Sequence, residues 1–327
     1  MPLEHTIRPV RRKIRIDDLY RVSTKKEKLM IPNQPQLAQP SASALNVARC
    51  RAIAAHDTRP AIQGQDYLAE VFLDEAGRQS LTNPVVFPLI LKKLDAFSPG
   101  AYEYFIARTA YLDQIVKQAF ADHRAQIVFL GAGYDTRAYR FADLIGAARV
   151  FELDEAVTQA HKRAVLQAAN IASPAQLTFV ALDFTVDDLA DKLRQAGYDP
   201  AAQTLFIWEG VTYYLPPATV NATLDFIRSN SARGSRVAFD YMLPEAQCEG
   251  RFGAQQARAG MRSLYTSEPL HFDLDEAQIS TFLAQRGFEL VEHLSADEMQ
   301  TRYLMLPDGT PAGHMLDLFR LVQAQTV

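Results

Sequence analysis

The segment spanning residues 127–137 constrains the fold of this chain more than any other. An apolar run at 127–130 leads directly into a Gly-Ala-Gly turn from Gly131 to Gly133, and a helix-like stretch follows. This order of strand, glycine turn and helix presents backbone N–H groups and a helix N-terminus to a ligand in α/β sheets. Because glycine has no Cβ, the main chain can approach the ligand closely. The segment therefore predicts a binding turn, although glycine pairs also simply reverse a chain after a strand.

The turn departs from the pattern of a dinucleotide site. That fingerprint places a third small residue three positions after the second glycine, and Thr136 stands there instead. The segment therefore favours a nucleoside-type cofactor that lacks a pyrophosphate.

The composition excludes some classes of partner. The chain has 327 residues, which suits one large α/β domain with additions or two small domains. Its net charge is −4 and its isoelectric point about 6.0, so it lacks the basic field of nucleic-acid-binding proteins.

Signals for a membrane, for export and for metal are missing. No apolar run approaches the roughly 20 residues that span a bilayer, and the N-terminus lacks the apolar core of a signal peptide. Cys50 and Cys248 belong to no CxxC pair or Cys/His cluster, which argues against a disulfide framework or a zinc site. We therefore expect a cytoplasmic protein without a metal ion and without a membrane or nucleic-acid partner.

Apolar and helical segments alternate along the middle of the chain. Strands are expected at 127–130, 149–153, 177–182, 204–208 and 235–239, with helices at 136–145, 155–169, 186–196 and 217–229. Apolar strands linked by helices predict an α/β fold with a doubly wound, mostly parallel sheet and right-handed crossovers. A helix at 275–286 and two further strands, at 288–293 and 316–323, would bring the sheet to seven strands. This finish resembles that of class I methyltransferases.

The remaining segments suggest additions to this core. Residues 1–40 form a basic arm, either solvated or placed as a lid over the site or as a patch for an acidic partner. Residues 41–122 are expected to form an N-terminal helical cap, with helices at 43–55 and 102–120. The core is assigned to 123–241, an irregular inserted lid to 242–272, and a helix with the closing strands to 273–327.

Acidic residues end two of the expected strands. Glu152 and Asp154 close the second strand about 20 residues after the glycine turn, where a carboxylate binds ribose hydroxyls in nucleoside-binding α/β folds. Alternation places both on one face of that strand. Asp183 and Phe184 close the third strand and could contact adenine, although Asp183 is equally suited to cap the following helix.

Two further charges would meet at the same edge of the sheet. Glu209 ends the fourth strand, and a carboxylate in such an apolar setting needs a partner, either a ligand ammonium or a nearby arginine or lysine. Arg108, on the helix before the first strand, offers a planar fork for a carboxylate, or pairs with Asp113 or another acid. Tyr213 and Tyr214 follow Glu209, where they could contact a substrate or only pack.

Taken together and in order, these motifs resemble the leucine carboxyl methyltransferase family of enzymes that depend on S-adenosylmethionine (SAM), including its bacterial members of undefined substrate. The resemblance covers roughly residues 45 to 325. It rests on Ala107-Arg108-Thr109 with Asp113, Leu130 to Arg137, Phe151 to Asp154, Leu182-Asp183-Phe184, and Trp208-Glu209-Gly210 with Tyr214-Leu215.

The resemblance implies a role for each cofactor-side residue. Arg108 would hold the carboxylate of SAM, and the turn from Gly131 to Gly133 would face its methionine part. Asp154, with Glu152 as the weaker candidate, would bind ribose. Glu209 would lie near the α-amino group, and the adenine would contact Asp183 and Phe184.

The resemblance leaves the acceptor side open. Eukaryotic members carry an N-terminal lysine that contacts the cofactor, and here Lys25, Lys26, Lys28, Arg49 and Arg51 compete for that place. No motif defines the acceptor, so methylation of a protein phosphatase is not implied. The arginines of the expected lid, Arg251, Arg258 and Arg262, would suit an acidic small-molecule acceptor.

Methyl transfer from a sulfonium mainly requires alignment of nucleophile, methyl and sulfur. A carboxylate nucleophile arrives ionised and needs no base, which favours O-methylation of a carboxylate. A phenol or amine would need a base, for which Tyr213, Tyr241, His271 and His314 are candidates. Two alternatives stay open: a cyclase that converts SAM to methylthioadenosine and an azetidine-2-carboxylate-type amino acid, and a non-catalytic nucleoside-binding module.

Overall fold

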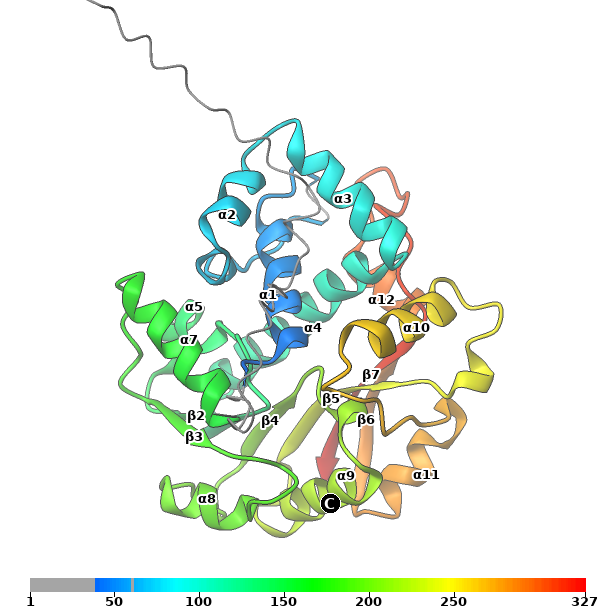
Figure 1. The fold of residues 1–327 in the computed structure, drawn as a ribbon. Coiled ribbons are helices and arrows are strands. Elements are labelled where there is room, and N and C mark those ends of the chain that lie inside the picture. The colour runs from blue at the N-terminus through cyan, green and yellow to red at the C-terminus, as the bar shows by residue number, and fades with distance from the viewer. Residues whose placement is uncertain (1–38, 60–61) are drawn as a thin grey trace, which may run out of the picture.

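The computed structural model describes residues 39–59 and 62–327. The expected basic arm therefore lies outside the described residues except for its last two positions. The described chain forms one central sheet with helices on both faces and a group of N-terminal helices at one edge (Figure 1).

The sheet has seven strands in the order β3-β2-β1-β4-β5-β7-β6. Strands β1 to β5 are parallel, and β7 pairs antiparallel with both β5 and β6, which confirms the expected doubly wound sheet with a hairpin-like finish. The strands are β1 (Gln126–Leu130), β2 (Arg149–Asp154), β3 (Leu177–Ala181), β4 (Thr204–Trp208), β5 (Arg236–Met242), β6 (Phe288–Leu294) and β7 (Phe319–Thr326).

The strand order reverses between β1 and β4. The chain runs from β1 outward to β2 and β3, then returns to place β4 on the other side of β1. In open α/β sheets, such a switch point leaves a crevice outside the carboxyl ends of the strands. The residues that follow β1 and β4 are therefore close in space. Gly131 and Glu209, for example, are 78 positions apart in the sequence but lie at the same crevice.

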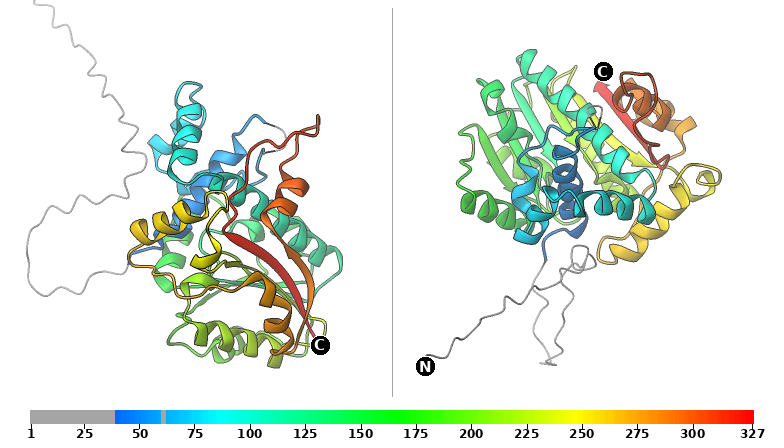
Figure 2. Two further views of the ribbon diagram at one scale, coloured as in Figure 1. Left: turned by 90° about the vertical axis from the view of Figure 1, so that its right-hand side faces the viewer. Right: turned by 90° about the horizontal axis from the view of Figure 1, so that it is seen from above.

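Both faces of the sheet are buried, because apolar residues alternate between two hydrophobic clusters. Phe129 and Ile207 belong to one cluster, and Val128 and Phe206 to the other. The first cluster also holds residues of α4 (Ala101–Ala121) and α7 (Ala156–Ala168), and the second those of α8 (Leu189–Gln195), α9 (Pro217–Ser229) and α11 (Ile279–Ala284). Figure 2 shows helices on both sides of the sheet.

The N-terminal helices form a cap, and most of its buried apolar residues belong to the first hydrophobic cluster. Besides α4 they are α1 (Ala42–Ala55), α2 (Glu75–Leu81) and α3 (Val86–Phe97). Ser41 caps α1, its Oγ accepting a hydrogen bond of 3.1 Å from the N–H of Ala44. The sequence pattern indicated α1 and α4 but did not distinguish α2 and α3.

Two expectations about helices were wrong. The helix expected at 136–145 is two short helices, α5 (Arg137–Arg140) and α6 (Ala142–Ile145), separated at Phe141. The segment expected to be irregular at 242–272 contains α10 (Ala254–Leu264), which buries Ala254 and Ala257 and leaves most of its polar residues outward. Polar residues dominate this helix, so its short apolar stripe was missed. The sequence pattern also did not indicate the last helix of the chain, α12 (Ala296–Tyr303).

Truncating a large side chain at the centre of the core should lower the free energy of unfolding. Phe206 is fully buried between the sheet and α9, so Phe206→Ala should lower the free energy of unfolding by about 3–5 kcal/mol. Denaturant unfolding measures this. The same substitution at Phe252, which is 45% exposed, should cost less than about 1 kcal/mol. Equal losses at both positions would contradict the assigned core.

Candidate functional site

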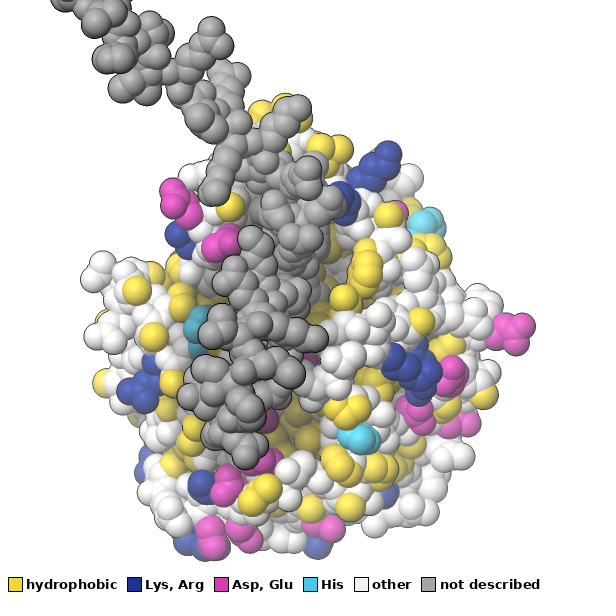
Figure 3. All heavy atoms as spheres, in the orientation of Figure 1, with side chains coloured by type: hydrophobic (Ala, Val, Ile, Leu, Met, Phe, Trp, Pro, Cys, Tyr) yellow, Lys and Arg dark blue, Asp and Glu magenta, His cyan; other side chains and the backbone are white. Residues whose placement is uncertain are grey.

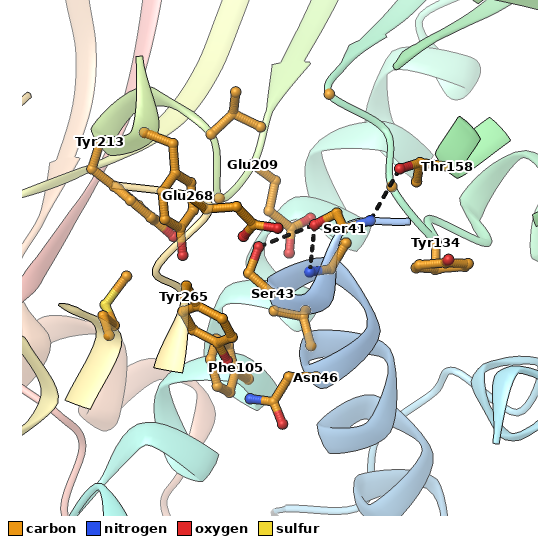
Figure 4. Close-up of a pocket in the computed structure, with 18 of the residues that line it drawn as sticks. Ser41, Ser43, Asn46, Phe105, Tyr134, Thr158, Glu209, Tyr213, Tyr265 and Glu268 are labelled. Carbon is orange, nitrogen blue, oxygen red and sulfur yellow. Dashed lines mark hydrogen bonds between the residues drawn. The ribbon is translucent and has the colours of Figure 1, made fainter. Parts of the chain in front are cut away.

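A cavity of about 550 Å³ lies at the carboxyl edge of the parallel strands. Its lining includes residues at or just beyond the ends of four strands: Gly131 after β1, Asp154 at the end of β2, Asp183 beyond β3 and Glu209 after β4. The first turn of α1 and the segment around Tyr265 complete the wall (Figure 4). The volume falls within the range of small-molecule and cofactor sites.

The glycine turn has the close packing that its sequence indicates. Gly131 and Gly133 both line the cavity and have φ angles of +69° and +49°, a region that favours glycine. A Cβ on Gly131 would lie 2.4 Å from Cγ2 of Val211, and one on Gly133 would lie 3.1 Å from Cβ of Ala44. The turn is therefore packed between the loop after β4 and the start of α1.

The first turn of α1 is held from two sides of the cavity. The N–H of Ser41 donates to Oγ1 of Thr158 on α7 at 3.2 Å, and the N–H of Ala42 donates to Oε1 of Glu268 at 3.1 Å. Glu268 follows α10, so the start of α1 connects α7 on the sheet with the segment inserted after β5.

The two acidic candidates of β2 have different environments. Asp154 lines the cavity and accepts hydrogen bonds from the N–H of Gly133 at 2.5 Å and of Glu155 at 2.8 Å. Burial raises the pKa of Asp154 to about 6 despite these donors. Glu152 does not line the cavity: it is 1% exposed and pairs with Nζ of Lys162 at 2.6 Å. Burial raises the pKa of Glu152 to about 7.

Asp183 and Phe184 both line the cavity beyond β3. Asp183 does not cap the next helix, because α8 begins at Leu189 and its cap is Asp188. Instead, Oδ1 of Asp183 accepts from the N–H of Thr185 at 2.8 Å and from its hydroxyl at 2.6 Å. The side chain is thus oriented locally and remains exposed at the rim.

Arg108 and Glu209 meet in the cavity wall, as part of a buried chain of charges. Nε of Arg108 lies 2.9 Å from Oε1 of Glu209, and Nη1 of Arg137 lies 2.7 Å from Oε2 of the same carboxylate. Burial opposes ionisation of Glu209, but Arg137 and Arg108 outweigh it and lower its pKa to about 2. Arg108 does not pair with Asp113, which instead binds Arg137 and Arg140.

Glu209 keeps one oxygen without a well-directed donor. Its Oε1 is buried and makes no hydrogen bond in the described part of the chain, although it is close to Arg108. A buried carboxylate oxygen in this state can accept a hydrogen bond from a ligand.

The other half of the cavity is apolar. Three helices supply its wall with residues at helical spacing, and two residues near the start of β7 complete it. They are Leu94 and Phe97 of α3, Ala101 and Phe105 of α4, Ala257, Met261 and Leu264 of α10, and Leu316 and Phe319. Figure 3 shows hydrophobic side chains on the outer face of this region. Phe97, the last residue of α3, is 51% exposed.

Of the candidates for a catalytic base, the structure brings only Tyr213 to the cavity. Tyr241 is buried outside it and its hydroxyl is hydrogen-bonded to Nε2 of His293 at 2.9 Å. His271 contributes a backbone N–H to the carbonyl of Tyr213, and the ring of His314 packs on Phe252. Neither histidine lines the cavity.

The arginines of the inserted segment do not face the cavity. Arg258 is bound to the carbonyl of Leu243 and to Asp273, each at 2.7 Å, and Arg262 pairs with Glu245 at 2.8 Å. Arg251 pairs with Glu276 and Asp317. These ion pairs remove the support that the arginines gave to an acidic acceptor, and the segment contributes Tyr265 and apolar residues instead.

Arg137 and Asp240 were given no role from the sequence, and Arg51 was only one of five candidates for a cofactor contact. Arg51 lines the cavity and pairs with Asp66 at 3.0 Å; Arg137 and Asp240 lie behind the wall. Arg137 is part of the recognised glycine motif, so its charge next to Glu209 was a usable signal. Asp240 interrupts an apolar strand, and such a buried carboxylate demands partners.

The fold and this site define a class of protein. A parallel sheet that ends in an antiparallel hairpin, with a cavity at its switch point, is the class I methyltransferase architecture. It is similar to the crystal structure of a "putative methyltransferase" from Thermobifida fusca, with a TM-score of 0.55 and 17% identity over 89% of this chain and 96% of that chain. It is also similar to the crystal structure of a DUF574 family protein from Streptomyces avermitilis, with a TM-score of 0.54 and 14% identity over 86% of this chain and 97% of that chain.

Sequence comparison identifies the family. The leucine carboxyl methyltransferase model matches residues 44–228, more than half of the chain. A "putative S-adenosyl-L-methionine-dependent methyltransferase" from Streptomyces avermitilis is 32% identical over 72% of this chain and 81% of its own length. A protein of the same description from Mycolicibacterium smegmatis is 31% identical over 79% of this chain and 84% of its own length. The chain therefore belongs to the leucine carboxyl methyltransferase family of SAM-dependent methyltransferases.

The residues present fit the cofactor of this family. Oε1 of Glu209, which is ion-paired with Arg108 but makes no hydrogen bond in the described structure, suits an ammonium. Gly131 and Gly133 place backbone rather than side chains along the cavity. Asp154 offers a carboxylate to ribose hydroxyls. Among the described residues, no cluster of side chains could hold a metal ion, and no helix has the length and apolar composition of a membrane span.

The affinity of the protein for S-adenosylhomocysteine, which is what SAM becomes after methyl transfer, should fall at low pH. Asp154 has a raised pKa of about 6, so it is protonated in the free protein below that pH. Ribose hydroxyls favour the ionised form, so binding must then release a proton. Calorimetry at pH 7.5 and at pH 5 should show roughly tenfold weaker binding at the lower pH.

Two variants identify the titrating group. Asp154→Asn should bind weakly at both pH values, without the pH dependence. Glu152→Gln should keep the pH dependence, because Glu152 titrates outside the cavity. A flat profile in the unmodified protein would contradict the placement of Asp154 on the ribose.

Proposed function

We propose that this enzyme transfers the methyl group of SAM to the carboxylate of a small molecule with an apolar body. In this proposal Asp154 binds the ribose, Asp183 and Phe184 flank the adenine, and the turn from Gly131 to Gly133 faces the methionine part. Glu209 receives the α-ammonium and Arg108 the carboxylate of SAM. Glu152 is left out, because its carboxylate is committed to Lys162.

The observation that carries the acceptor assignment is the protonation state of the cavity wall. No histidine lines the described part of the cavity. Burial raises the pKa values of Tyr213, Tyr214 and Tyr265, and raises that of the Cys50 thiol to about 12. A neutral tyrosine or thiol is a poor base, so a nucleophile that arrives ionised at neutral pH suits this wall best.

The apolar half of the cavity supports an apolar body for the acceptor. Among the described residues, its wall of leucine, phenylalanine and methionine side chains offers buried contact area but no unpaired cation. The described arginines that line the cavity, Arg51 and Arg108, are both paired with carboxylates on the cofactor side. Selection of the acceptor would therefore depend on its shape and apolar surface.

Bound SAM supplies a methyl group activated by the sulfonium, and the protein supplies alignment. The cofactor-side residues would fix the direction of the methyl, and the apolar wall would fix the acceptor in line with it. Transfer joins a cation and an anion into two neutral groups, which a wall of low polarity favours.

A second acceptor class, an alcohol or phenol, is favoured by Glu268. One of its oxygens holds the N–H of Ala42, while Oε2 is buried and makes no hydrogen bond in the described structure. This oxygen could accept a proton from a hydroxyl nucleophile. The two classes differ in how the rate depends on pH.

The test is product analysis with paired acceptors. We would incubate the enzyme with SAM and apolar aryl or alkyl carboxylates, with the matching amides and phenols as controls. The proposal predicts S-adenosylhomocysteine and a methyl ester from carboxylates only. With saturating SAM the rate should be flat from pH 7 to 9, whereas an unassisted phenol would gain about tenfold per pH unit below its pKa near 10. Methylation of phenols that depends on Glu268 would replace the carboxylate assignment.

The apolar wall can be tested separately. Met261→Asp places a negative charge in the acceptor half, so it should raise the KM for a carboxylate acceptor about tenfold or more while the affinity for S-adenosylhomocysteine stays unchanged. Arg262→Ala is the neighbouring control, since Arg262 pairs with Glu245 outside the cavity. Unchanged KM in Met261→Asp would move the acceptor site away from α10.

A further inference from the structure

Asp240 accepts three hydrogen bonds behind the cavity wall but does not line the cavity. It lies on β5 with a fully buried side chain. Its oxygens accept from the N–H of Gly210 at 2.6 Å, from Nη1 of Arg108 at 2.7 Å and from the hydroxyl of Tyr104 at 2.6 Å. These donors come from two places, helix α4 and the loop after β4, so one side chain connects them.

The loop that Asp240 holds carries Glu209. Gly210 follows Glu209 directly and has a φ of +74°, and its N–H points to the Asp240 carboxylate. The hydroxyl of Thr212 also donates, at 2.5 Å, to the backbone carbonyl of Asp240. The position of Glu209 in the cavity wall is therefore set from β5 as well as from β4.

Asp240 also decides how Arg108 shares its charge. Arg108 is ion-paired with Asp240 and Glu209, and its guanidinium lies 5.1 Å from the centre of the Tyr104 ring. Asp240 gives Arg108 a carboxylate partner behind the wall. Without it, Glu209 would have to neutralise Arg108 and would be a poorer acceptor for a ligand ammonium.

We propose that Asp240 is a positioning residue for the amino-acid end of SAM. It holds Arg108 and the loop of Glu209 at a fixed spacing, so that the ligand carboxylate and ammonium meet prepared partners. This inference rests on the proposed roles of Arg108 and Glu209 toward SAM, and it is independent of the acceptor.

Two ligands separate positioning from a general structural role. S-adenosylhomocysteine carries the amino-acid end, whereas 5′-methylthioadenosine keeps the adenosine and the thioether but lacks that end. In Asp240→Asn we expect about tenfold or more weaker binding of S-adenosylhomocysteine by calorimetry, because a hydrogen-bonded charge behind Arg108 is lost. Binding of 5′-methylthioadenosine should stay within about twofold of the unmodified protein.

A matched control is available on β2. Glu152→Gln removes an equally buried, ion-paired carboxylate outside the cavity, so it should leave both affinities unchanged. If Asp240→Asn does not fold, Tyr104→Phe removes one donor while its ring keeps the stack on Phe319. That variant should bind S-adenosylhomocysteine about threefold more weakly and 5′-methylthioadenosine normally.

The outcomes are distinct. Selective loss of S-adenosylhomocysteine binding supports the inference, and equal loss of both ligands, or no loss of either, overturns it. If the unmodified protein binds neither ligand, the assignment of the cavity to SAM fails instead. An acceptor other than a carboxylate would leave this binding experiment unaffected.

Discussion

The charged half of the cavity depends on Arg137. This arginine is 1% exposed and contacts three carboxylates, those of Asp113 on α4, Asp135 in the glycine turn and Glu209 after β4. Around it, ion pairs run continuously through the described structure: Arg51–Asp66–Arg140–Asp113–Arg137–Glu209–Arg108–Asp240. Removing one member would leave a buried charge without its partner, which is far costlier than the pair is worth. The turn, the helix and the strand end are thereby locked together.

Stability alone does not explain this network. Burying charges costs desolvation, and well-packed apolar side chains can often replace buried ion pairs without loss of stability. Within residues 39–59 and 62–327 the network is also unbalanced: with Asp135 it holds four arginines and five carboxylates, a formal net charge of −1. A cationic ligand next to Glu209 would balance it. The imbalance is thus more readily explained by ligand binding than by folding.

The sequence predicted the sheet and the edge at which the cavity lies, because both follow short-range rules. Apolar strands alternate with helices, and the carboxyl ends of parallel strands converge, so the sequence alone places Gly131, Asp154, Asp183 and Glu209 at one edge, where all four line the cavity. The charge pairing was not predictable in the same way. Arg108 was expected to hold a ligand carboxylate or to pair with Asp113 or another acid, and no local rule named its actual partner Asp240, which lies 132 residues away in the sequence. The polar helix α10 was missed because only a narrow stripe of it is apolar.

The two halves of the cavity have different origins in the chain, and this difference bears on specificity. The charged half is built from strand ends and from α4, all inside the region that matches the family model. Much of the apolar half comes from α10 and from the residues before β7, which follow residue 228, where that match ends. A fold of this kind can keep its cofactor chemistry while the apolar wall changes with each acceptor. The family motifs do not define the acceptor. It is therefore best identified by testing candidate acceptors on variants of Met261, Leu264 and Phe97, which line the apolar wall.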